Sequence, residues 1–308
     1  MNIKQVLMRL NAVGYEYIQD IRKKLMSQMR DIIRKIDMNI SFDEVEEKKE
    51  QKQFEKKYKD ANLLPLANTL IEEDKLQPEE GKYLLDIFDI QIPLISQLEK
   101  EYKKKMGKLV QNELIYTEFL AGIRGIDKVL SAKLVKELGD CSQFKTVSKL
   151  WAYCGQLVIN GKAPQKRKGV SITYNPNLRA LSWVISDCLM KQNKGYYREI
   201  YDTEKEKQLN KEYPIGYLHK MYSGKIKRTG KDLYPESAIK LTQGHAHARA
   251  LRKMRKIFLD HYWHASRELA GLPAKKNYVE GILLHNHIST WREALKRESN
   301  KDKSGGIE

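Results

Sequence analysis

Cysteine is scarce in this chain of 308 residues. Only Cys141, Cys154 and Cys188 are present, and no two of them form a C-x-x-C pair. An odd number of separated cysteines argues against a zinc ribbon and favours a reducing compartment.

Long apolar runs are also missing. No stretch approaches the roughly 18 apolar residues that suggest a membrane-spanning helix. The first residues, MNIKQVLMRLNAVGYEYIQD, carry charges throughout and lack the apolar core of a signal peptide. We therefore expect a soluble, cytoplasmic protein with no membrane partner.

The sequence lacks the usual signatures of nucleotide and metal chemistry. No G-x-x-x-x-G-K-[ST] loop is present, which removes the usual NTPase interpretation. A two-metal nuclease needs several converging carboxylates, whereas Asp86 and Asp89 lie in an expected helix and the other candidates are scattered. We expect no cofactor and no metal.

Histidines are the remaining candidates for a metal site. His261 and His264 share one helix face, but pairs spaced i, i+2 would face apart on a helix, and no acid or cysteine spacing completes a site. We expect histidines that are solvated or contact phosphates. The two i, i+2 pairs are His245 with His247 and His285 with His287.

Positive charge is abundant and unevenly distributed. Lys and Arg number 57 against 40 Asp and Glu, a net charge of +17. Residues 1–110 hold 21 basic and 20 acidic side chains, which leaves 36 and 20 for residues 111–308. A basic region beside a neutral one fits a polyanion-binding module joined to an oligomerising module. Lysine-rich surfaces also occur for solubility alone.

Residues 1–110 are expected to form a helical hairpin or coiled-coil arm that associates with a second copy. Apolar residues recur in steps of three and four from Ile3 to Ile36, which predicts one long amphipathic helix. The capping-box pattern from Ser41 starts a highly charged helix. Pro65 should interrupt the chain before a short helix, Pro78 suits a first helical turn, and Pro93 should kink or end a helix.

Residues 119–139, FLAGIRGIDKVLSAKLVKELG, are typical of a helix-hairpin-helix. Two glycines allow a tight turn, and the backbone N–H groups at the start of the second helix favour an anion such as a DNA phosphate. The alternative is a plain hairpin of two helices. The predicted nucleic-acid contacts here are Gly122, Arg124, Gly125, Lys128 and Lys133.

A basic loop follows the hairpin. Gln156 to Ile159 and Val170 to Tyr174 could form a short β-hairpin around it. The predicted phosphate contacts are Lys162, Lys166, Arg167 and Lys168, with Arg179 at the next helix start. Ser171 is a candidate nucleophile, but no base is identified by spacing, so a turn serine is the alternative.

Basic and aromatic residues dominate the remainder. Tyrosines and lysines interleave over residues 196–240, which suits exposed bases, although tyrosines also fill contacts between loop and core. The helices of residues 241–298 are basic, and residues 299–308 should be a disordered tail. The predicted phosphate-tracking residues are Arg249, Arg252, Lys253 and Lys256.

The order of motifs between Phe119 and Met190 resembles the C-terminal domain of the bridge-RNA-guided, DEDD-type insertion-sequence transposases of the IS110/IS116/IS902 family. After the glycine-rich hairpin come Gly139-Asp140 with Phe144, then Ala152-Tyr153-Cys154-Gly155, the Gly-Lys basic loop, and Asn175, Leu178 and Arg179 of an N-x-x-L-R helix start. The resemblance implies a transposase-like domain over residues 111–195 and binding to DNA.

Two departures qualify what the resemblance implies. The family's catalytic serine precedes the Gly-Lys of the basic loop, whereas this chain has Asn160 there. The family's RuvC-like N-terminal domain, with its metal-binding acids, has no counterpart in residues 1–110.

The predicted fold is therefore mainly α, with an N-terminal arm and a helix-hairpin-helix domain. The predicted function is binding of nucleic acid, most simply duplex DNA, by a transposase-related homo-oligomer without transposase catalysis. The alternatives are an active transposase that uses Ser171 and an RNA-binding or structural scaffold.

Overall fold

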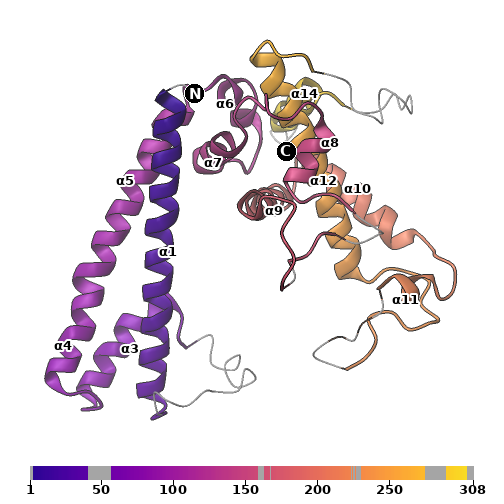
Figure 1. Cartoon of the computed structure of the whole chain (residues 1–308). Helices are drawn as coiled ribbons and strands as arrows, with labels where there is room; N and C mark the ends of the chain where they lie inside the picture. Colours follow the sequence, from indigo (N-terminus) through magenta and orange to yellow (C-terminus); the bar gives the residue numbers. More distant parts are fainter. Residues whose placement is uncertain are drawn as a thin grey trace. The chain divides into compact units, whose positions relative to one another are not determined.

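The computed structural model describes residues 3–40, 57–158, 163–166, 168–222, 224, 226, 230–274 and 289–303. The chain divides into two compact units, Met1–Lys108 and Leu109–Glu308. Within the described residues the regular structure is helical and contains no strand, which confirms the mainly α fold (Figure 1). None of the described helices is both long and apolar enough to cross a membrane.

The first unit is built on α1 (Ile3–Asp37), which confirms the predicted long helix. Helix α5 (Ile92–Val110) lies alongside it (Figure 1). The Arg22 guanidinium donates to a Glu99 carboxylate oxygen at 2.7 Å, and the Tyr102 ring lies against Gly14. The result is the expected helical hairpin.

Two shorter helices cover the C-terminal half of α1. Helices α3 (Asp60–Glu72) and α4 (Pro78–Asp86) pack there around a core that includes Met29, Ile33 and Leu70. The predicted charged helix that begins at Ser41 lies outside the described residues.

The prolines of the first unit differ from expectation in two places. Pro78 begins α4, as predicted, with a Gln77–Glu80 capping box. Pro65, however, lies inside α3, because its ring is on the exposed side while Leu63 and Leu70 hold the opposite face in the core. No helix ends at Pro93, which is the second residue of α5; a single π-helical turn, η1 (Ile87–Gln91), precedes this helix and joins α4 to α5.

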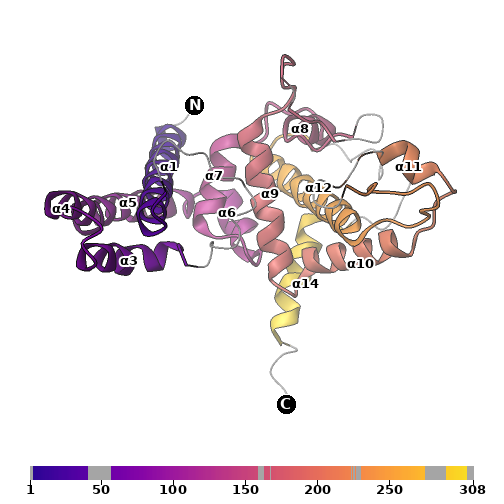
Figure 2. The same ribbon diagram turned by 90° about the horizontal axis from the view of Figure 1, so that it is seen from below.

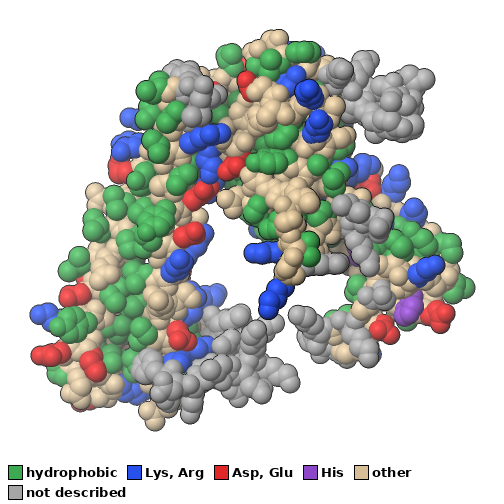
Figure 3. Space-filling model, viewed as in Figure 1, with side chains coloured by type: hydrophobic (Ala, Val, Ile, Leu, Met, Phe, Trp, Pro, Cys, Tyr) green, Lys and Arg blue, Asp and Glu red, His purple; other side chains and the backbone are tan. Residues whose placement is uncertain are grey.

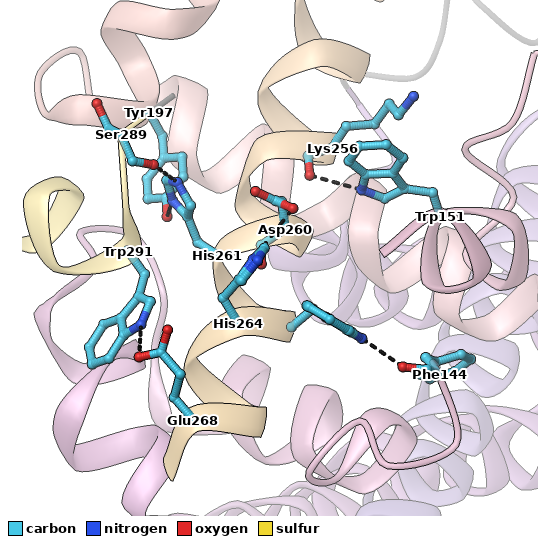
Figure 4. Close-up of polar contacts among 11 residues, drawn as sticks. Phe144, Trp151, Tyr197, Lys256, Asp260, His261, His264, Glu268, Ser289 and Trp291 are labelled. Carbon is cyan, nitrogen blue, oxygen red and sulfur yellow. Dashed lines mark hydrogen bonds and ion pairs between the residues drawn. The ribbon is translucent and has the colours of Figure 1, made fainter. Parts of the chain in front are cut away.

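The second unit is organised around α12 (Gln243–Leu269), which is buried along most of its length. Helices α8 (Val147–Tyr153), α9 (Pro176–Lys191) and α10 (Tyr196–Asn210) pack on it, together with α6 (Leu114–Glu118) and α14 (Trp291–Lys303) (Figure 2). Figure 4 shows how side chains fasten α12 to its neighbours. The Trp151 indole N–H donates to the Lys256 carbonyl at 3.0 Å, and the Trp291 indole N–H donates to Glu268 at 3.1 Å.

The Tyr-rich segment is mostly packed rather than exposed. Tyr196, Tyr197 and Tyr201 of α10 are buried, and Tyr213 and Tyr234 join a small core with Leu218 of α11 (Tyr217–Tyr222). For these five tyrosines the contact between loop and core is the correct interpretation.

The possible β-hairpin around the basic loop is not formed by its described residues. Residues 156–158 and 170–174 contain no strand. The Gln156 side chain turns into the core, whereas Leu157, Val158, Val170 and Ile172 remain exposed, so the two segments have no buried face to hold them in register.

The C-terminal tail was expected to be disordered from residue 299, but α14 continues to Lys303. Trp291, Ala294 and Glu298 are buried on one side of the helix, and this packed face sustains helical structure into the following residues.

Candidate nucleic-acid interface

The predicted hairpin contains the short helices α6 and η2 (Leu120–Gly122), then a turn, then α7 (Lys128–Leu138). Asp127 caps α7, because its Oδ1 accepts a hydrogen bond from the Leu130 backbone N–H at 2.8 Å. A carboxylate of the chain itself thus occupies the start of α7, where a phosphate was expected.

Both glycines of this turn are needed for packing. Gly125 has a φ of +81°, and a Cβ there would lie 3.0 Å from the Cys188 carbonyl oxygen on α9. A Cβ on Gly122 would meet the Leu295 side chain of α14. Arg124 faces the buried Glu298 carboxylate at 3.6 Å. These contacts favour the alternative, a plain helical hairpin that packs on its neighbours.

The two lysines of the hairpin lie on α7. Lys128 is exposed, and its ammonium donates to the Gln111 amide oxygen at 3.1 Å. Lys133 is half-buried. Their role as phosphate contacts stays a prediction.

Helix α12 is buried along most of its length, because it is the centre of the second unit, so its basic residues do not form one continuous exposed side. Lys253 forms an ion pair with Glu204 of α10 at 2.8 Å. Arg255 is buried, with 9% of its surface exposed. A duplex could therefore reach only the part of α12 that its neighbours leave accessible, and phosphate contact by Arg249, Arg252, Lys253 and Lys256 stays a prediction.

One group of cations nevertheless remains without acidic partners. It consists of five side chains, here called the cation cluster, from α9 and α12: Arg179, Arg249, Arg252, Arg255 and Lys256. None of them forms an ion pair with a carboxylate of the described residues.

The cluster is assembled around residues 155 and 156. The Arg255 guanidinium donates to the Ser186 hydroxyl at 2.9 Å and to the Gln156 amide oxygen at 3.3 Å. Beside Gln156, the Arg179 side chain lies so close to Gly155 that a Cβ there would be 3.0 Å from Arg179 Cδ. Gly155 has a φ of +65°, a second reason for glycine at this position.

Burial and mutual repulsion both act on the cluster. Burial, together with the charges of Arg252 and Arg179, lowers the pKa of Arg255 to about 10. Burial likewise lowers the pKa of Arg252 and of Lys256. No hydrogen bond or ion pair joins Arg252 to another described residue. The cluster is therefore positively charged, partly desolvated and unneutralised within the described chain.

Aromatic rings support the edges of the cluster. The Lys256 ammonium lies 4.1 Å from the centroid of the Trp151 ring, and the Arg179 guanidinium lies 4.7 Å from that of Tyr174. Arg179 also donates to the Pro164 carbonyl, which ties the basic loop to the cluster. Lys166 and Lys168 of this loop are exposed. Lys162, Arg167 and Asn160 lie outside the described residues.

The family comparison concerns the segment that contains α7, α8 and α9. Residues 117–202 match the Transposase IS116/IS110/IS902 family. The resemblance predicted from the motifs between Phe119 and Met190 is thereby confirmed. No curated protein and no solved structure matches the chain. The matched segment supplies Arg179 and the basic loop, whereas the other four cations of the cluster follow it on α12.

Ser171, the candidate nucleophile, follows the basic loop of the matched segment and is exposed. Within the described residues its hydroxyl has no hydrogen-bonding partner, so the structure offers no base beside it.

Histidines were expected to be solvated or to contact phosphates, but three of them bond to tyrosines. Nδ1 of His245, His247 and His261 lies 2.8, 2.7 and 2.8 Å from the hydroxyl of Tyr234, Tyr201 and Tyr197, respectively. The described residues contain no group of His, Cys, Asp and Glu that could hold a metal ion.

Sequence reasoning missed the importance of Arg255, His245 and Tyr222. Arg255 lies one turn after Arg252, a spacing that places the two on one side of α12. Nothing in the spacing of Tyr222 indicates its contact with Arg249, because the two come from segments that only the fold brings together.

Proposed function

We propose that the second unit binds duplex DNA at the cation cluster, as part of a transposase-related protein. The observation that supports this proposal is the absence of any ion pair between the five cations and a carboxylate of the described residues. Partly buried like charges repel one another, and an anion that binds between them relieves this repulsion.

A phosphodiester backbone fits this requirement better than an isolated anion. Arginine presents a planar fork of donors that matches phosphate oxygens. The exposed Lys166 and Lys168 beside the cluster would extend the contact to neighbouring phosphates along a strand. The family match of residues 117–202 supports a nucleic acid as the partner.

Binding need not be accompanied by the serine chemistry that the resemblance implies. Asn160 stands where the resemblance places the nucleophilic serine, and an amide cannot form a covalent bond to a DNA phosphate. Ser171 is exposed and has no base beside it among the described residues.

The first unit supplies self-association in this proposal. The face of α1 opposite its buried face carries exposed apolar side chains between residues 3 and 17, with exposed fractions of 42% or more. Residues 1–110 are nearly neutral in charge, so two copies would not repel each other. The exposed side chains are Ile3, Leu7, Leu10, Val13 and Tyr17.

The affinity of labelled duplex DNA for single-residue variants tests the binding proposal. Arg252→Gln removes a cation that has no bond to other described residues, and we expect its dissociation constant to rise about tenfold, which corresponds to ~1.4 kcal/mol. Arg292→Gln is the matched control. It removes the same charge from α14, where Arg292 is already paired with Glu268. We expect little change in the dissociation constant for duplex DNA.

Fluorescence anisotropy at constant salt provides this measurement, with duplex RNA as a competitor. Equal losses in the two variants would contradict binding at the cluster. Tighter binding to RNA than to DNA would replace duplex DNA by the RNA-binding alternative.

A further inference from the structure

Arg249 of the cation cluster holds two tyrosine hydroxyls directly, those of Tyr222 and Tyr213. Tyr222 ends α11, and its hydroxyl accepts a hydrogen bond from Arg249 Nη2 at 2.7 Å. The other end of the same guanidinium, Nη1, donates to the Tyr213 hydroxyl at 2.6 Å and to Gln208 at 2.8 Å. Arg249 is thus fixed by three bonds and presents Nη2 to Tyr222.

Tyr222 differs from its neighbours in accessibility. The Tyr213 and Tyr234 side chains are buried, with 9% and 1% of their surfaces exposed. Tyr222 is only half-buried. Of the three tyrosines, Tyr222 is therefore the one whose side chain is partly accessible to a ligand.

An imidazole lies against the Tyr222 ring. The His245 ring meets it edge to face, with 4.4 Å between the ring centroids. Its Nδ1 lies 2.8 Å from the Tyr234 hydroxyl, and no hydrogen bond joins His245 to the Tyr222 hydroxyl. Burial lowers the pKa of His245, and Arg249 and Arg252 lower it further, so the imidazole adds no positive charge beside Tyr222 at pH 7.

Arg252 is the second arginine near Tyr222, and its guanidinium is available to stabilise negative charge on a ligand. Arg252 interacts electrostatically with Tyr222 and with Arg249, yet it forms no hydrogen bond or ion pair within the described residues. Two guanidinium groups near a phenol hydroxyl are suited to the negative charge that develops on a phosphoryl group under attack.

We propose that Tyr222 is a nucleophile that forms a covalent ester with a phosphodiester bound in the cation cluster. This inference rests on the proposed binding of DNA. It assigns to the same site an activity that binding alone does not require.

The step balances as a transesterification. The Tyr222 oxygen forms a bond to phosphorus, and its proton passes to a water molecule. The bond from phosphorus to one sugar oxygen breaks, and that oxygen takes up a proton from water as it leaves. The chain of the nucleic acid is cut, the phosphate stays attached to Tyr222 as a diester, and no oxidant, nucleotide or metal is consumed.

An activated phosphodiester tests the proposal without knowledge of a DNA sequence. The probe is thymidine 5′-(4-nitrophenyl phosphate), incubated with the full chain. We expect one nitrophenolate released per chain and a thymidylate group on Tyr222, located by mass spectrometry of peptides. Tyr222→Phe should give neither product.

Tyr217→Phe is the matched control, because Tyr217 lies on the same helix, is 43% exposed, and has no hydroxyl bond within the described residues. It should form the adduct as the unaltered chain does. Duplex affinity measured on each protein separates a catalytic loss from a folding or binding loss. Normal duplex binding without an adduct, or an adduct on Ser171 or another residue, would overturn the assignment and leave the proposed function standing.

Discussion

At the scale of single residues, His261 shows how burial fixes a protonation state. Its Nε2 lies 2.8 Å from the Ser289 carbonyl oxygen, which can only accept a hydrogen bond, so Nε2 carries the proton (Figure 4). Nδ1 then accepts from the Tyr197 hydroxyl. Burial lowers the pKa of His261 to about 4, which keeps the ring neutral in the folded chain.

This arrangement makes stability depend on pH. Because the pKa in the folded state lies below the ordinary value near 6.5, the unfolded chain binds more protons between pH 6.5 and 4. The stabilising effect is complete above pH 6.5 and is lost as the pH falls toward 4. Between pH 7 and 5 the free energy of unfolding of the second unit should fall by roughly 2 kcal/mol more than in His261→Gln.

Denaturant titrations at the two pH values provide the comparison. His261→Gln is the appropriate reference because carboxylates titrate in both proteins, while only the unaltered chain has the buried imidazole. Parallel pH dependences of the two proteins would contradict the assignment of a neutral His261.

At the scale of helices, sequence periodicity predicted helix α1 but did not predict which helices surround α12. The steps of three and four from Ile3 to Ile36 predicted α1, because apolar residues that recur at this spacing over such a length lie on one face of a single helix. The cations of α12 suggested an exposed helix, yet their partners lie far along the chain. Lys253 pairs with Glu204, and Arg255 with Ser186. The spacing of residues within one helix does not indicate which distant residues they contact.

The hairpin before α7 shows the same limit. Its glycines and capping residue were visible in the sequence, but the reason for the glycines was not. Gly125 is required by the Cys188 carbonyl and by a positive φ, which belong to the packing of α9 on the turn. The candidate site at Tyr222 could not be predicted either, since α11 and α12 meet only in the fold.

The exposed apolar face of α1 leads to a prediction about assembly. Leu10 is 63% exposed, and an aspartate there would place a charge in the proposed contact between copies. We expect Leu10→Asp to weaken self-association and to lower the mass found by light scattering at a given concentration. Gln28→Asp is the control, because it adds the same charge to an exposed position beyond this apolar face. A monomeric unaltered chain would contradict the proposal.

At the scale of the whole molecule, charge separates two tasks. Residues 1–110 carry a net charge of +1, and residues 111–308 carry the remaining +16. Figure 3 shows Lys and Arg side chains spread over the visible face of both units, with Asp and Glu side chains interspersed on both. Composition indicated a polyanion partner, whereas the fold was needed to distinguish the paired cations from the cation cluster.

The salt dependence of duplex binding tests the central claim most directly. Each phosphate contact contributes about 0.9 to the slope of log K against log salt concentration. Arg252→Gln combined with Lys168→Gln should lower that slope by about 1.8. Arg292→Gln combined with Lys191→Gln, which removes the same charge from side chains paired with Glu268 and Asp187, should leave it unchanged. Equal slopes for the two double variants would contradict DNA binding at the cation cluster.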